Sequence, residues 1–143
     1  MERHEMTTMP RTASETIQPI GTVRDWLRAE AAAAFFVGIA LYGWLGAPWL
    51  ALLPLLLVPD VSMVGYVRSP RLGAVTYNLV HNWVLGLGVL GLGLASGIVP
   101  VSVAGAILIA HVGMDRMLGY GLKLSSFQET HLGRIGREGK GQS

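Results

Sequence analysis

Two long stretches of the chain carry no charged residue. No Asp, Glu, Lys or Arg occurs between Glu30 and Asp60, and none occurs between Arg71 and Asp115. A helix that crosses a bilayer needs about 20 mostly apolar residues, so each stretch is long enough for about two spans. Gly and Pro residues divide each stretch near its middle. The pattern therefore predicts four membrane-spanning helices, at Glu30–Leu45, Pro48–Tyr66, Leu72–Ser96 and Val101–Tyr120.

The composition agrees with a membrane protein and excludes some other classes. Of the 143 residues, 51% are hydrophobic and only 14% are charged, whereas a soluble domain has nearer a quarter charged. The net charge of +2 is too small to predict a nucleic-acid partner. Because the chain has no cysteine, it forms neither a disulfide framework nor a thiolate metal site.

The basic residues predict the orientation in the membrane. Arg68 and Arg71 lie in the loop between the second and third spans, and further basic residues precede the first span and follow the fourth. The loops around Ala47 and Ile98 contain no Lys or Arg, so the positive-inside rule places them outside the cell. We expect an all-α integral membrane four-helix bundle in the cell membrane, with both termini cytoplasmic. It divides into a disordered polar tail (1–22), the four-helix domain (23–124) and a cytoplasmic tail (125–143).

The third predicted span is rich in glycine, with Gly86, Gly88, Gly91, Gly93 and Gly97. Glycines let helix backbones approach closely in lipid, and Gly93 and Gly97 have the small-xxx-small spacing. We expect this helix to pack tightly within the bundle or to form the face of a homodimer.

Several polar residues interrupt the apolar spans, and ionisable groups at membrane depth are costly enough to suggest a function. At a rise of about 1.5 Å per residue, Asp60 lies roughly 12 Å from Arg68, and His81 lies roughly 15 Å from Arg71. Measured back from Lys123, Asp115 lies at roughly 12 Å and His111 at roughly 18 Å. Pro59 removes a backbone donor next to Asp60, which predicts a kink and a freed carbonyl near these groups. The sequence therefore predicts one polar layer in the cytoplasmic half of the bilayer.

Helical spacing predicts that these side chains share one inward face. His111 and Asp115 are four residues apart on the fourth span, so both can reach one point. On the third span, Tyr77 and Asn78 precede His81 by four and three residues, which makes them candidate pocket residues.

Two imidazoles with two or three carboxylates suit a divalent transition metal, Zn, Mn or Fe, because Ca and Mg sites rarely use His. Facing bundle helices build carboxylate-bridged metal sites in this way. A metal with an open position makes hydroxide near neutral pH, which would hydrolyse a lipid-derived, amphipathic ester or phosphate. The predicted ligands are Asp60, His81, His111 and Asp115, with Glu30 as a fifth ligand or general base and Arg116 neutralising an anionic substrate.

Two other interpretations use the same residues. In a purely structural network, Asp115 would pair with Arg116 or Arg71, and His81 would bond Asn78 or Tyr77. Alternatively, a carrier coupled to protons or ions would also need carboxylates and histidines at depth. Four short spans would need to dimerise to build a transport path.

Four runs of sequence resemble a bacterial integral-membrane family catalogued as domain of unknown function number 4260. They are Pro59 to Tyr66 (PDVSMVGY), Tyr77 to His81 (YNLVH), His111 to Lys123 (HVGMDRMLGYGLK) and Thr130 to Gly136 (THLGRIG). The resemblance covers about Arg24 to Gly136. It implies a small four-helix membrane protein and no activity. It adds His131 as a candidate lid or further ligand, because this residue belongs to the last run.

Overall fold

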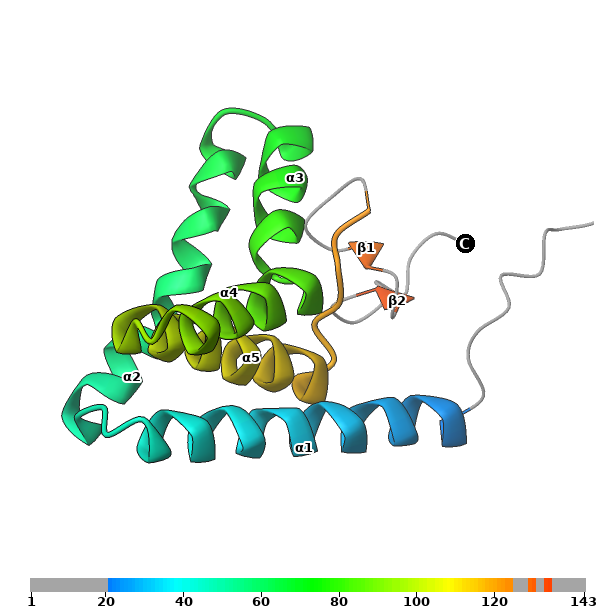
Figure 1. Ribbon diagram of the computed structural model, residues 1–143. Coiled ribbons are helices and arrows are strands. Elements are labelled where there is room, and N and C mark those ends of the chain that lie inside the picture. The colour runs from blue at the N-terminus through cyan, green and yellow to red at the C-terminus, as the bar shows by residue number, and fades with distance from the viewer. Residues whose placement is uncertain (1–20, 125–128, 131–132, 135–143) are drawn as a thin grey trace, which may run out of the picture.

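The computed structural model describes residues 21–124, 129–130 and 133–134. Most of both predicted tails, including His131, lies outside the described residues. The described chain is almost entirely helical (Figure 1). Its elements are α1 (Gly21–Trp44), α2 (Trp49–Leu57), the 3₁₀ helix η1 (Val58–Val67), α3 (Pro70–Val80), α4 (Trp83–Ser96), α5 (Val99–Leu118), and the antiparallel strands β1 (Glu129–Thr130) and β2 (Gly133–Arg134).

Three helices are long and apolar enough to cross a membrane: Val23–Trp44, Trp49–Val67 and Val99–Leu118. A fourth span results if the bent pair α3 and α4 counts as one. The start of α1 and the end of α5 lie on the same side of the molecule (Figure 1). Their cytoplasmic location remains a prediction.

The third predicted span, Leu72–Ser96, is not one continuous helix. It breaks at His81 and Asn82, and the two halves are bent by 42°. The Asn82 side chain accepts a hydrogen bond from the backbone N–H of Leu85 and so caps the start of α4. His81, with φ −95° and ψ 42°, ends α3 outside the helical conformation. The polar residues that we placed within a helix therefore end one helix and begin another.

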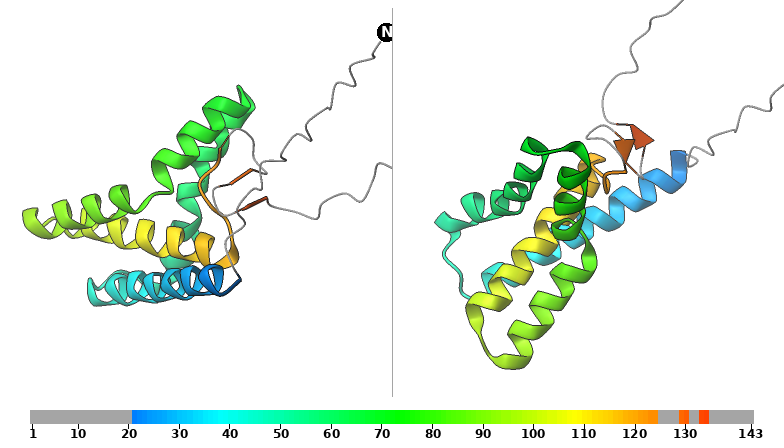
Figure 2. Two further views of the ribbon diagram at one scale, coloured as in Figure 1. Left: turned by 90° about the vertical axis from the view of Figure 1, so that its right-hand side faces the viewer. Right: turned by 90° about the horizontal axis from the view of Figure 1, so that it is seen from above.

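Helix α5 forms the centre of the structure, between α1 and α4 (Figures 1 and 2). Small residues allow this close packing. A Cβ added to Gly38 of α1 would lie 2.8 Å from the Cβ of Ala110, and one added to Gly105 of α5 would overlap the backbone of Leu90 in α4. As a result, nearly half of α5 is buried, and its inner positions are held firmly in place.

The hairpin formed by η1 and α3 stands at a steep angle to α1 and α5 (Figures 1 and 2). Gly65 and Gly73 allow its two arms to touch, since added side chains would overlap Thr76 and Tyr66. The Thr76 hydroxyl also donates to the Ser62 carbonyl oxygen over 2.7 Å. The described helices thus form a three-helix layer with an angled hairpin, which is less regular than the predicted four-helix bundle.

The glycines of α4 serve two different purposes. Gly86 and Gly93 face α5, where added Cβ atoms would meet Ile109 and Ser102. Gly88 and Gly91 are exposed, and an added Cβ would have no neighbour within 4 Å. The prediction of tight packing within the chain therefore applies to the first pair. A homodimer remains a prediction, and within α4 it would have to use the second pair.

Candidate metal centre

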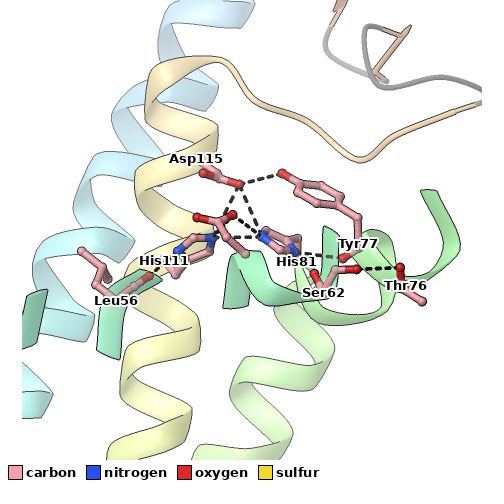
Figure 3. Close-up of polar contacts among 8 residues, drawn as sticks. Leu56, Ser62, Thr76, Tyr77, His81, His111 and Asp115 are labelled. Atoms are coloured by element: carbon pink, nitrogen blue, oxygen red, sulfur yellow. Dashed lines mark hydrogen bonds and ion pairs between the residues drawn. The ribbon is translucent and has the colours of Figure 1, made fainter. Parts of the chain in front are cut away.

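Two histidines and an aspartate converge where α5 meets the angled hairpin (Figure 3). Asp60 comes from η1, His81 from the break between α3 and α4, and His111 from α5. The two imidazole Nε2 atoms are 2.9 Å apart. The Asp60 Oδ1 atom lies 3.4 Å from Nε2 of His81 and 3.5 Å from Nε2 of His111. These residues each offer one ligand atom, and the three atoms lie within 4.8 Å of one another.

Backbone carbonyl groups hold both imidazole rings. His111 Nδ1 lies 2.6 Å from the carbonyl oxygen of Leu56, and His81 Nδ1 lies 2.9 Å from that of Tyr77. A carbonyl oxygen can only accept, so each Nδ1 carries a proton and donates it. In a neutral imidazole the other nitrogen, Nε2, then has a free lone pair. The structure therefore turns the two Nε2 atoms toward one another and toward the Asp60 carboxylate.

This convergence suits a cation at its centre. Two imidazole lone pairs at 2.9 Å repel one another unless a proton or a metal ion lies between them. For Zn²⁺ ligands at about 2.0–2.1 Å, adjacent donor atoms of a tetrahedron are about 3.3–3.4 Å apart. The three observed separations, 2.9, 3.4 and 3.5 Å, bracket that value. Ligating histidines also typically donate their second N–H to a carbonyl or carboxylate, as both do here.

Asp115 lies next to the three ligand residues, at a slightly greater distance. Its Oδ2 atom is 3.8 Å from both Nε2 atoms and accepts a 2.6 Å hydrogen bond from the Tyr77 hydroxyl. The Tyr77 ring also stacks on His81, with centroids 3.7 Å apart. Tyr77 thus fixes the orientation of His81 through its ring and its carbonyl group, and that of Asp115 through its hydroxyl (Figure 3).

Access to the centre is uneven. The side chains of His81 and His111 are 2% and 0% exposed, and that of Asp115 is 14% exposed, whereas that of Asp60 is 42% exposed. A small molecule would therefore approach the two buried imidazoles from the side of Asp60.

Two local irregularities of the helical backbone create this geometry. The α-helical pattern of α2 changes to a 3₁₀ helix at Val58, with Pro59 in its first turn. Just before this change, the Leu56 carbonyl oxygen accepts from His111 instead of serving only its own helix. The predicted freed carbonyl is thus present, and it orients a ligand. At the second irregularity, the break after Val80 brings the His81 ring beneath Tyr77.

The remaining predicted residues lie around the centre or apart from it. The Arg116 guanidinium carbon lies 5.5 Å from the centroid of the Trp83 ring. The Asn78 side chain pairs with the backbone of Lys123, through two hydrogen bonds of 2.7 Å. Glu30 is exposed on α1 and does not belong to the ligand group found among the described residues. The structure thus gives no geometric support for Glu30 as fifth ligand or base.

The segment that follows α5 covers the Tyr77 side of the centre. Lys123 is buried, pairs with Asn78 through its backbone, and holds its ammonium 5.0 Å from the centroid of the Tyr77 ring. This burial lowers the pKa of Lys123 from its ordinary value, and the negative charge of Asp115 opposes the shift. Sequence reasoning missed Lys123, although its position in the run shared with His111 was a usable signal.

The Tyr77→Phe variant tests the hydrogen bond that the Tyr77 hydroxyl donates to Asp115. Loss of a hydrogen bond to a carboxylate oxygen should lower the free energy of unfolding by about 1.5–3 kcal/mol. Tyr42→Phe is the matched control, because the Tyr42 hydroxyl donates over the same 2.6 Å to the carbonyl of Pro48, which predicts a loss of about 0.5–1.5 kcal/mol. Denaturant unfolding in detergent measures both, and equal losses would contradict a stronger bond at Asp115.

The sequence runs that supply the centre also identify the family. A family described as Domain of unknown function (DUF4260) matches residues 24–135. The chain belongs to this family. The match includes Asp60, His81, His111 and Asp115, so the whole cluster lies within the family domain. No curated protein and no solved structure matches the chain.

Proposed function

We propose that the protein is a metal-dependent membrane hydrolase in which Asp60, His81 and His111 bind one divalent transition metal. The observation that carries the proposal is the pair of Nε2 atoms facing each other at 2.9 Å, each with its Nδ1 bonded to a carbonyl. Three protein ligands leave a fourth tetrahedral position for water, which is the pattern of catalytic rather than structural zinc sites.

The ligand set restricts the metal. Two imidazole nitrogens and one carboxylate oxygen suit Zn²⁺, and the same set with further open positions suits Fe²⁺ or Mn²⁺. Ca²⁺ and Mg²⁺ prefer oxygen ligands only. We therefore use Zn²⁺ as the probe ion in the tests below.

Asp115 would act as the proton acceptor. Its Oδ2 atom lies 3.8 Å from Nε2 of His81 and from Nε2 of His111, beside the position where these residues and Asp60 would hold the metal. A metal held there would supply a hydroxide nucleophile near neutral pH. Asp115 would take up the proton that the attacking water loses and would return it to the leaving alcohol oxygen as the ester bond of the substrate breaks. Arg116, the residue after Asp115, would stabilise the negative charge that develops.

The surroundings favour a hydrolase over the carrier interpretation. An apolar groove of about 860 Å³ extends from η1 toward the turn at Gly46. Its lining is apolar apart from the Ser62 hydroxyl and backbone groups, and an ion would need polar or charged groups along such a route. The purely structural interpretation predicts that a proton, and not a metal ion, lies between the two imidazole nitrogens. The metal content of the purified protein distinguishes this interpretation from the hydrolase.

Asp60→Asn and Asp115→Asn should give different defects. Loss of the Asp60 carboxylate should lower Zn²⁺ affinity by at least the roughly 10–100-fold typical of perturbed metal sites. Asp115→Asn should retain zinc and lower kcat by about 10²–10⁴-fold, as expected when a proton acceptor is lost. Zinc titration and hydrolysis of long-chain para-nitrophenyl esters and phosphodiesters measure the two effects in detergent.

Asp25→Asn is the matched control, because Asp25 is an exposed carboxylate on α1, and it should behave as the wild type. If Asp60→Asn and Asp115→Asn both lower only thermal stability, and the wild type cleaves none of the esters or phosphodiesters, the hydrolase proposal is wrong.

A further inference from the structure

An apolar groove lies beside the segments that carry the candidate ligands. Its volume is about 860 Å³, which is within the range of about 300–1,000 Å³ for small-molecule sites. It lies between the second transmembrane segment (α2 and η1) and α5, and includes Val80 at the end of α3. No charged side chain lines it.

The inner end of the groove is lined by residues that are close in sequence to the candidate ligands. Pro59 precedes Asp60, Val80 precedes His81, and Ile107 lies one helical turn before His111. The opposite end is formed by the turn Leu45–Pro48 and by Val99 and Pro100 at the start of α5. The groove therefore runs from the segments that carry the candidate ligands to the end of α1 and the start of α5.

The length of the groove matches half of a bilayer. At about 1.5 Å per residue, the chain from Pro48 to Pro59 rises roughly 16 Å. The hydrocarbon core of a bilayer is about 30 Å thick, so one leaflet contributes about 15 Å. A hydrocarbon chain of leaflet length would thus fill the groove and place its polar end at Asp60.

We propose that this groove holds the hydrocarbon chain of a single-chain, long-chain amphiphile whose polar group lies at the metal centre. The inference rests on the proposed function and names its substrate class. An apolar lining that ends at an accessible carboxylate suits an acyl or isoprenoid chain with one polar end. Because the lining offers only the hydroxyl of Ser62, a chain with polar substituents along its length would leave them without hydrogen-bond partners.

Photolabelling with a diazirine derivative of palmitic acid tests the proposal on the full chain in nanodiscs. The label should concentrate on peptides that contain Val58–Ser62 and Val99–Leu108, and unlabelled palmitic acid should compete for it. Ala104→Phe places a bulky ring in the groove at an exposed position of α5, so the fold should tolerate it. It should weaken the competition about tenfold, comparable to losing contact with about two methylene groups.

Ala33→Phe is the matched control, since Ala33 is exposed on α1 and does not line the groove; it should leave labelling unchanged. Label spread evenly over all lipid-facing helices, or label that Ala104→Phe does not alter, would overturn the proposal and indicate ordinary bilayer lipid. A change of oligomeric state in Ala104→Phe, measured by light scattering, would also overturn it, because a second copy would then cover the groove.

A chelator separates this inference from the proposed function. We expect groove labelling to persist after treatment with EDTA, because the apolar contacts do not involve the metal. If unlabelled palmitic acid competes for the label in a protein that binds no zinc, the groove proposal is supported and the hydrolase proposal is wrong. If the protein binds zinc but unlabelled palmitic acid does not compete for the label, the metal centre is supported and the groove proposal is wrong.

Discussion

Replacing either His81 or His111 with alanine is expected to lower Zn²⁺ affinity by more than about 100-fold, the upper range for residues that only support a metal site. Each variant removes one of the two nitrogens that face each other at 2.9 Å. Because both imidazoles would bind the same ion, the double variant, left with Asp60 alone, should bind zinc at least as weakly as either single variant. Zinc titration against a competing chelator measures the affinities.

Ser96→Ala is the control for this experiment. Among the described residues, the Ser96 hydroxyl bonds only to carbonyl groups of its own helix, at Leu92 and Gly93. Its loss should leave zinc affinity unchanged. If each His→Ala variant retains wild-type affinity, the two histidines are part of a structural network. His131→Ala, measured in parallel, tests whether the tail contributes a further ligand.

A leucine at position 105 is expected to destabilise the protein by more than about 3 kcal/mol, above the usual range for overpacking. A Cβ at Gly105 would overlap the backbone of Leu90, and backbone atoms cannot turn aside as a flexible side chain can. The helices α4 and α5 would have to separate, which would also displace His111. Thermal unfolding in detergent should show a large decrease in Tm together with a loss of zinc binding.

Gly88→Leu is the matched control, because an added Cβ there would have no neighbour within 4 Å. We expect stability to stay within about 0.5 kcal/mol of the wild type. The same variant tests the homodimer, since a leucine at Gly88 would disrupt any close packing between two copies of α4. Equal destabilisation by Gly88→Leu and Gly105→Leu would contradict the described packing of α4 on α5.

The convergence of Asp60, His81 and His111 was predictable from the sequence, because charged loops serve as depth markers. A straight helix rises by a fixed amount per residue, so distances from the arginines and lysines place each polar group at a level in the membrane. Spacing of four residues also placed His111 and Asp115 on one helix face. These two regularities were sufficient to identify the cluster without knowledge of how the helices pack.

The features that the sequence did not show depend on irregular backbone and on tertiary contacts. The break at His81 was missed because hydropathy alone predicts one span for this long apolar run, although Asn82 in its middle caps a new helix. Asp115 stays a predicted ligand, and its 2.6 Å hydrogen bond with Tyr77 depends on a contact between helices that the spacing does not show. Glu30 was placed near the site by its depth, but depth does not specify which way a helix face points, and Glu30 is exposed.

The angled hairpin explains why the candidate metal centre is both firmly held and accessible. Four parallel helices would bury their polar groups among one another. Here the steep angle of η1 and α3 to α5 leaves Asp60 partly exposed and leaves a groove beside it. The two histidines remain buried on α5 and at the end of α3. One side of the metal centre is thus accessible, while the other is held rigidly by carbonyl groups and by Tyr77.

The metal content of the purified full chain tests the central claim most directly. After loading with zinc and removal of weakly bound ions in detergent, elemental analysis should find about one Zn²⁺ per chain, as expected for a site with three protein ligands. The His81→Ala and His111→Ala variants should retain little or none. A wild-type protein that retains no stoichiometric zinc, manganese or iron would contradict the proposed metal centre. In that case a proton would lie between the two imidazole nitrogens.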